Sequence, residues 1–118
     1  MSLLGFDDAP KVFIYAKPTD MRKGFDGLYG LVINEMDIDP RLGYLFVFMN
    51  KNRNLIKVLH WNRDGLALFY KRLEKGTFKR PTAQLNAPNS ELLKEELYMI
   101  LHGIDFEKTK KRKRFLVT

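Results

Sequence analysis

The 118-residue sequence contains no cysteine. That absence excludes disulfide bonds, cysteine nucleophiles, and zinc or iron–sulfur sites that depend on thiolate ligands. Histidine is scarce as well, since the sequence has only two, His60 and His102. Neither histidine belongs to a metal-ligand spacing motif. No apolar run approaches the roughly 20 residues that a membrane-spanning helix needs, and the N-terminus lacks the basic-then-apolar pattern of a secretory signal. The sequence therefore predicts a cytoplasmic protein with no membrane partner, no bound metal and no cofactor.

The motifs of common active sites are also missing. No serine occupies a Gly-x-Ser-x-Gly turn, and no glycine-rich loop has the spacing of a phosphate-binding or dinucleotide-binding fingerprint. The carboxylates Asp20, Asp26 and Asp64 are the candidates for a metal-dependent nuclease, in which acidic side chains hold two metal ions. We interpret Asp20 and Asp64 as helix caps, and Asp26 lies outside the apolar stripe of its predicted helix. A nuclease is therefore the least favoured function, and we predict no enzymatic activity.

Positive charge is concentrated in two places. Lys and Arg number 21 against 14 Asp and Glu, so the formal net charge is +7. Residues 51–80 carry nine basic and two acidic side chains, and residues 107–118 carry six and one, whereas the other two blocks are acidic. Basic side chains gain affinity for nucleic acid by releasing counterions from its phosphates. The distribution indicates one basic surface and one basic arm for a polyanionic partner, with a solvated face that binds nothing as the alternative.

The candidate nucleic-acid-binding residues come from both basic blocks. In the middle block they are Lys51, Arg53, Lys57, Arg63, Lys71, Arg72, Lys75, Lys79 and Arg80. In the tail they are Lys110, Lys111, Arg112, Lys113 and Arg114. Like-charge runs are normally solvated, so the tail serves either as a binding arm or as a solubilising terminus. No helix-turn-helix spacing, zinc finger or aromatic RNA-binding motif is visible, which leaves DNA and RNA both open as partners.

The apolar fraction of 45% is enough for one modest core. We expect residues 1–106 to form a single α+β domain and residues 107–118 to form a mobile basic tail. Its small, largely antiparallel sheet would pack with two or three helices in the order β-α-β-β-α-(β)-α. Strands are predicted at residues 11–16, 44–49 and 55–61, with a short edge strand at 77–79. Helices are predicted from Thr19 or Asp20 to about Met36, and from Asn89 or Ser90 to about His102.

Residues 65–75 fit two patterns. As a strand, Gly65 to Tyr70 would extend the preceding strands into a meander. As a helix, the segment has Asp64 as its N-cap, Gly76 just past its end, and an apolar stripe that only Leu68 fails to join. The two caps favour the helix, which would gather Lys71, Arg72 and Lys75 on one side.

Three glycines interrupt the first predicted helix at every third residue. Gly24, Gly27 and Gly30 lie opposite its apolar stripe, beside Lys23. Each interior glycine costs a helix about 1 kcal/mol relative to alanine. Either tertiary packing rescues a marginal helix, or another backbone approaches this smooth face. The second interpretation makes Lys23, Gly24, Gly27 and Gly30 a candidate partner-binding site, for a second protein or for another copy of the chain.

Three segments together resemble one family of mobile-element proteins. They are residues 18–28 (PTDMRKGFDGL), residues 43–61 around Tyr44-Leu45-Phe46-Val47-Phe48 and His60-Trp61, and residues 64–78 around Tyr70-Lys71-Arg72-Leu73. In this order and spacing the chain resembles the accessory protein encoded by the second open reading frame of the insertion sequence 66 family of bacterial transposons. The resemblance implies a role in transposition beside a separate transposase, with DNA and the transposase as partners. It brings no catalytic residue to this chain.

Two functions therefore lead. The first is a non-enzymatic accessory protein that binds DNA, at the transposon ends or without sequence preference, through residues 51–80 and the tail. The second is a protein–protein adaptor that docks the transposase or another copy of itself through the glycine-faced helix. The two are compatible.

Overall fold

The computed structural model describes residues 8–79 and 88–103 of the chain. The strands are β1 (Val12–Tyr15), β2 (Leu45–Met49), β3 (Leu55–Asn62), β4 (Gly65–Arg72) and β5 (Asn89–Leu92). The helices are α1 (Phe25–Asn34), the short 3₁₀ helix η2 (Pro40–Leu42) and α2 (Lys94–Leu101). The strands form one sheet in the order β4-β3-β2-β1-β5, in which only β1 and β2 run parallel.

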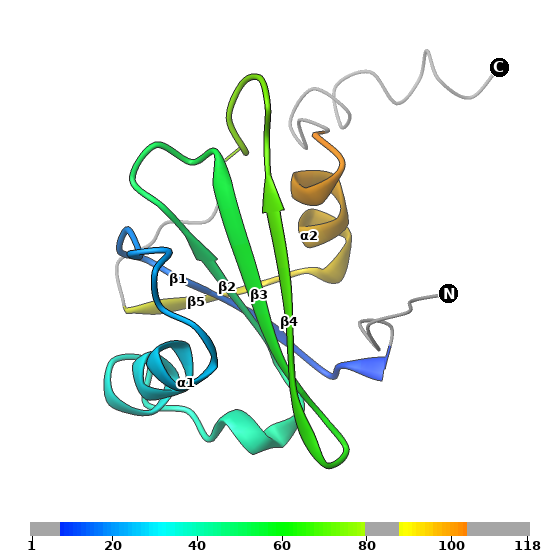
Figure 1. The fold of residues 1–118 in the computed structure, drawn as a ribbon. Helices are drawn as coiled ribbons and strands as arrows, with labels where there is room; N and C mark the ends of the chain where they lie inside the picture. Colours follow the sequence, from blue (N-terminus) through cyan, green and yellow to red (C-terminus); the bar gives the residue numbers. More distant parts are fainter. Residues whose placement is uncertain (1–7, 80–87, 104–118) are drawn as a thin grey trace, which may run out of the picture.

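The sheet is covered on both faces, because its central strands are apolar on both. β2 lies in the middle, and all of its residues are buried. On one face, Leu28 of α1 packs in a cluster with Phe46 and Phe48. On the other face, Leu97 of α2 packs in a cluster with Val47. Figure 1 shows the two helices on opposite sides of the sheet. Each of these fully buried side chains stabilises the fold by about 1.5–3 kcal/mol.

The predicted α+β class with a mostly antiparallel sheet is confirmed. The strands expected at residues 11–16, 44–49 and 55–61 correspond to β1, β2 and β3. Their side chains alternate between the two clusters, as the period of a strand requires. In β3, for example, Leu59 packs on the α1 side and Val58 on the α2 side.

The helix favoured for residues 65–75 is wrong, because this segment forms β4. It pairs with β3 along its whole length through the tight turn that contains Asp64, so Asp64 is a turn residue and not a helix cap. Leu66 and Leu68 pack on the α1 side, whereas Phe69 packs on the α2 side. A strand with both faces in apolar surroundings has apolar residues at neighbouring positions, and such a run also fills a helical stripe.

Both remaining helices begin later than the sequence predicts. α1 begins at Phe25, since the residues after Thr19 and Asp20 form a loop, and it ends at Asn34, two residues before Met36. α2 begins at Lys94, and no side chain at its N-terminus acts as the expected Asn or Ser cap. Asn89 and Ser90 belong to β5, which pairs antiparallel with β1 and completes its backbone hydrogen bonding.

The short strand expected at residues 77–79 is not formed. Phe78 is fully buried in the α2-side cluster instead, and its backbone N–H donates to the carbonyl oxygen of Arg53 at 2.7 Å. The basic tail at 107–118 lies outside the described residues. Within the described residues, no helix combines the length and apolarity that crossing a bilayer would require.

Candidate nucleic-acid interface

Three chain segments meet at one end of the sheet. Residues 17–24 join the end of β2, where the Thr19 N–H donates to the carbonyl oxygen of Met49 at 2.8 Å. Residues 50–54 connect β2 to β3, and the Leu73 N–H donates to the carbonyl oxygen of Asn54 at 2.8 Å. We call residues 17–24, 50–54 and 72–79 together the basic end. In Figure 1 the 50–54 and 73–79 loops lie side by side at the upper end of β3 and β4, and residues 17–24 are the blue trace that leads from β1 to α1.

The basic end presents several cations that have no counter-ion among the residues that the structure describes. Within the described ranges, no ion-pair partner lies near five of its side chains, namely Lys23, Lys51, Arg53, Lys75 and Lys79. All are exposed except Arg53, which is partly buried. The same segments contain two carboxylates, Asp20 and Glu74. The excess of positive charge at this end is therefore large and open to solvent, as contact with phosphates requires.

The turn at residues 50–54 is held by its own amide side chains. The Asn50 side-chain oxygen accepts hydrogen bonds from the N–H groups of Asn54 at 3.1 Å and Leu55 at 3.0 Å. The Asn50 side-chain nitrogen donates to the Asn54 side-chain oxygen at 2.7 Å. These bonds support Arg53 at φ 57°, a left-handed conformation that a non-glycine residue adopts only when its surroundings compensate. Lys51 is thus presented on a rigid turn.

The two carboxylates of the basic end are engaged by neighbouring arginines. Asp20 pairs with Arg22, whose guanidinium lies 2.7 Å from a carboxylate oxygen, and Glu74 pairs with Arg72 at 2.8 Å. Hydrogen bonds from the Arg22 side chain and backbone lower the pKa of Asp20 to about 2. Since each carboxylate forms an ion pair with an arginine two residues away in the sequence, neither neutralises the cations on the other segments.

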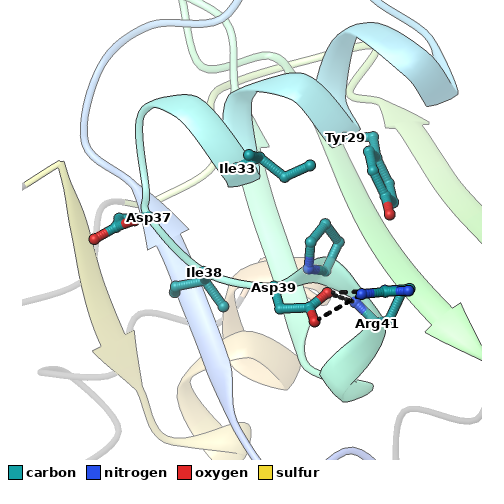
Figure 2. A pocket seen from close by; sticks show the side chains of 7 residues that line it. Tyr29, Ile33, Asp37, Ile38, Asp39 and Arg41 are labelled. Carbon is teal, nitrogen blue, oxygen red and sulfur yellow. Dashed lines mark hydrogen bonds and ion pairs between the residues drawn. The ribbon is translucent and has the colours of Figure 1, made fainter.

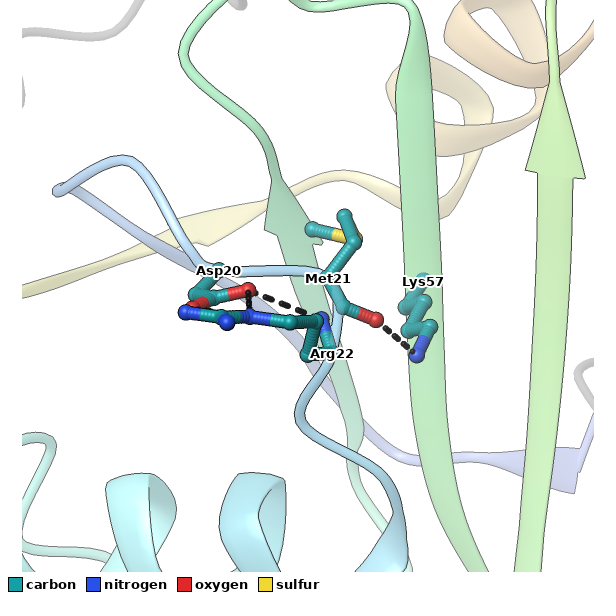
Figure 3. A network of polar contacts seen from close by, with 4 residues as sticks. All are labelled: Asp20, Met21, Arg22 and Lys57. Atoms are coloured by element: carbon teal, nitrogen blue, oxygen red, sulfur yellow. Dashed lines mark hydrogen bonds and ion pairs between the residues drawn. The ribbon is translucent and has the colours of Figure 1, made fainter.

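Lys57 is a structural residue, although the sequence pattern groups it with the DNA-binding candidates. Its side chain lies on the α1 face of the sheet and is only 5% exposed. Its ammonium group donates to the carbonyl oxygens of Met21 at 2.8 Å and Lys23 at 2.7 Å, and it lies 4.4 Å from the ring centre of Tyr70. Figure 3 shows Lys57 reaching the loop at Met21, with the Asp20–Arg22 pair beside it. Lys57 therefore fixes the 17–24 loop at the basic end.

Lys71 is also used within the fold. It lies on the opposite face of the sheet from Lys57, because its partner in the ladder is Ile56. Its ammonium group donates to the carbonyl oxygen of Leu101 at 2.8 Å. The last carbonyls of a helix have no partner within the helix, and a cation there also meets the negative end of the helix dipole. Lys71 thus caps α2.

The other basic candidates divide by position. The grouping of Lys71, Arg72 and Lys75 on one helix face is wrong, since Lys71 and Arg72 are neighbours in a strand and point to opposite faces. Arg63 lies in the β3–β4 turn, at the far end of eight-residue strands that span about 25 Å. Arg80 and the tail residues Lys110, Lys111, Arg112, Lys113 and Arg114 lie outside the described residues.

One cation that sequence reasoning missed is Arg22, and Lys23 was assigned to a different site. Both lie in the loop that Lys57 holds against the end of the sheet. The family resemblance at residues 18–28 includes this loop, but nothing in the local sequence indicates that the loop lies beside the 50–54 turn.

The structure does not bring the candidate nuclease carboxylates together. Asp20 is paired at the basic end, Asp64 lies in the turn at the opposite end of the sheet, and Asp26 lies exposed in the first turn of α1. Among the residues that the structure describes, no group of three or more acidic or histidine side chains could hold a metal ion. His60 is buried in β3, and His102 follows the end of α2.

The outer face of α1 is open around its glycines. A Cβ atom at Gly30 would meet only the Asn34 side chain, at 3.9 Å, and one at Gly27 would meet the Lys23 side chain at 3.1 Å. Gly24 precedes the helix and has nothing within 4 Å. No backbone of the described chain therefore approaches this face, and the possibility of approach by a partner stays a prediction.

A shallow pocket lies between α1 and η2. It has a volume of about 300 Å³ and is lined by Tyr29 and Ile33 of the helix and by residues 37–41. Figure 2 shows the Asp39–Arg41 pair on one side of it and Asp37 on another. Ile33 is 44% exposed, which is high for its residue type.

Comparison with known proteins identifies the family. The family described as IS66 Orf2 like protein matches residues 10–111. Two proteins of Sinorhizobium fredii are similar: the uncharacterized protein y4jC is 28% identical over 93% of this chain and 92% of its own length, and the uncharacterized protein y4hO is 36% identical over 81% and 82%. No solved structure matches. The predicted resemblance is thereby confirmed, and the chain belongs to the IS66 Orf2-like family.

Proposed function

We propose that this protein is a non-enzymatic accessory factor in the transposition of an IS66-type element, and that it binds DNA through the basic end. Membership of the family supports a role in transposition. The single observation that carries DNA binding is the set of exposed cations on three adjoining segments, with both nearby carboxylates already paired. A protein of this kind would act in the bacterial cytoplasm, beside the transposase that cuts and joins the DNA.

The arrangement suits the DNA backbone better than the bases. The cations come from loops and turns, and within residues 8–79 and 88–103 no helix or two-stranded ribbon projects from the basic end to enter a major groove. Flexible lysines contact phosphates without selecting a sequence. We therefore propose that the basic end binds duplex without strong sequence preference, and that the transposase supplies recognition of the element's ends.

The salt dependence of binding tests this function. Fluorescence anisotropy with a labelled duplex should show log K falling linearly with log salt concentration, with a slope of about −4.5 for about five phosphate contacts. An RNA duplex of the same sequence, used as a competitor, separates DNA from RNA as the preferred ligand. Binding that does not change with salt, or no binding at low salt, would contradict the proposal.

The basic tail is a proposed second contact. Replacing Lys110, Lys111 and Lys113 by Gln in the full chain removes three charges and leaves the described fold untouched. If the tail contacts phosphates, the slope of log K against log salt becomes less negative by up to about 2.7. If the tail only solubilises the protein, the slope is unchanged.

A docking role for the α1 face is the second candidate. It is favoured by the open surface over Gly30, the exposed Ile33 and the pocket of about 300 Å³ beside them. The transposase of the same element is the proposed partner. A Gly30→Leu substitution should then abolish co-purification with the transposase, whereas Asn62→Leu, at an exposed position on the far end of β3, should not. Equal co-purification of both variants would refute this role.

A further inference from the structure

The two edges of the sheet differ in their protection. β5 is only four residues long and carries Glu91, two features that discourage pairing with another strand. β4 is eight residues long, contains no proline, and has charges only in its last two residues, Lys71 and Arg72. No strand of the described chain pairs with its outer edge. A long, apolar, unprotected edge of this kind readily pairs with another strand.

The hydrogen bonding shows which groups face outward. The Leu73 N–H donates to Asn54, which begins the ladder between β4 and β3. Bonded and non-bonded pairs alternate along an antiparallel ladder. The backbone N–H and C=O groups of the odd-numbered residues from 65 to 71 therefore form hydrogen bonds with β3. The same groups of the even-numbered residues point outward from the edge of the sheet, namely those of Leu66, Leu68, Tyr70 and Arg72.

We propose that two copies of this chain form a dimer through antiparallel pairing of β4 with β4, with Leu68 on the two-fold axis. The sheet then continues through both copies. Each outward N–H and C=O of residues 66–70 meets its complement in the second copy, because the same even-numbered positions face outward in both. Leu68 lies opposite Leu68, and Leu66 lies opposite Tyr70.

Charge selects this register over its neighbours. With Leu68 on the axis, the Arg72 end of one strand lies beside the Asp64 turn of the other, so opposite charges meet at both ends of the pair. A shift that puts Phe69 on the axis brings Asp64 against Glu74 of the second copy, and like charges there disfavour it. A shift that puts Ala67 on the axis places Arg63 against Lys71 of the second copy, and these like charges disfavour that register as well.

The side chains that would meet are apolar and incompletely covered. Leu66 and Leu68 are partly buried, and Tyr70 is 51% exposed although it is a large aromatic residue. Pairing would place Tyr70 of each copy against Leu66 of the other, which is an aromatic–aliphatic cross-strand contact. Residues 66–70, which make the pairing, belong neither to the outer face of α1 nor to the basic end, and only the flanking Arg72 is shared with the basic end. The pairing therefore needs no bound DNA.

Cross-linking tests the pairing, because the natural chain has no cysteine. In an antiparallel bonded pair the two Cα atoms at the axis are about 5.5 Å apart, within the range that a disulfide spans. Full-length Leu68→Cys, oxidised with oxidised glutathione in the absence of DNA, should form a covalent dimer at least tenfold faster than Leu66→Cys. In the same register the Cα atoms of two cysteines at position 66 are about 14 Å apart. Equal rates for the two variants, or no cross-link at position 68, would overturn the proposal.

A charge exchange tests the register without altering an apolar side chain. Sedimentation equilibrium of the wild-type chain should show a species of twice the 13.9 kDa chain mass. Asp64→Arg and Arg72→Asp should each weaken the dimer about tenfold, and the double variant should restore it. A monomeric wild-type protein, or a double variant as weak as the single ones, would contradict the pairing.

Discussion

The ammonium nitrogen of Lys57 lies 2.8 Å from the carbonyl oxygen of Met21, to which it donates a hydrogen bond. A second bond to the Lys23 carbonyl and the Tyr70 ring complete its surroundings. Among the described residues of the basic block 51–80, Lys57 is the buried cation, and it serves to hold a loop. The loop in turn carries Arg22 and Lys23 to the basic end, so the contact links the fold to the proposed binding surface.

Replacement of Lys57 by Met should lower the free energy of unfolding by about 2–3 kcal/mol. The substitution keeps the length of the side chain but leaves the carbonyl oxygens of Met21 and Lys23 without their donor. Denaturant titration followed by circular dichroism measures the change. The control is Lys51→Met, on the exposed 50–54 turn, which should change the free energy by less than about 0.5 kcal/mol. Equal effects of the two substitutions would show that Lys57 has no structural role.

Replacement of Lys71 by Met should destabilise the C-terminal turn of α2. It removes the donor to the Leu101 carbonyl and a cation at the negative end of the helix, for a loss of about 1 kcal/mol. Relative to the wild-type protein, amide hydrogen exchange in Lys71→Met should become faster in α2 and stay unchanged in α1. Lys75→Met supplies the comparison, since Lys75 is exposed and caps no helix, and it should leave exchange in α2 unchanged.

Replacement of Gly30 by Ala should stabilise the isolated protein by about 0.5–1 kcal/mol. Gly30 lies inside α1, its φ is not in the left-handed region, and a Cβ atom there meets only Asn34 at ordinary contact distance. The midpoint of thermal unfolding should rise. A fall would mean that the α1 face has a contact within the chain, and the docking role proposed for that face would lose its basis.

The ion pair with Arg22 should set the pKa of Asp20. Hydrogen bonds from Arg22 lower the pKa of Asp20 from 3.8 to about 2, so the pair stabilises the loop above pH 3.8 and is lost as the pH falls toward 2. In Arg22→Ala the pKa should rise toward 3.8, measured by the carboxyl carbon shift in NMR. Asp39, whose pKa is lowered by Arg41, should titrate as before. An unchanged Asp20 would show that Arg22 is not the cause.

The strands of the central sheet could be predicted because their signal is local. In β3, Lys57 and Leu59 alternate with Val58 and His60, and no helix accommodates that period. β4 could not be assigned in the same way, since an apolar run that packs on both faces also fits a helix. Leu68, which did not fit the helical stripe, was the residue that indicated the strand, and it packs on the α1 side.

The position of the basic side chains in the fold was only partly predictable. The sequence grouped Lys51, Arg53, Lys75 and Lys79 because they lie in one basic block, and the structure places them in the loops that follow β2 and β4. Their role in binding stays a prediction. The roles of Lys57 and Lys71 were not predictable, because their acceptors are carbonyl oxygens 36 and 30 residues away in the sequence. Only the packing of the loop and of α2 against the sheet brings those acceptors within reach.

A matched pair of charge reversals tests the central claim most directly. Lys75→Glu at the basic end and Lys11→Glu, just before β1 at the opposite end of the sheet and away from the β4 edge, change the net charge equally, and both residues are exposed. Affinity for a duplex is measured by fluorescence anisotropy at several salt concentrations. We predict that Lys75→Glu weakens binding about tenfold and makes the salt slope less negative by about 1, whereas Lys11→Glu changes affinity less than threefold and leaves the slope unchanged. Equal losses in the two variants would contradict a DNA-binding site at the basic end.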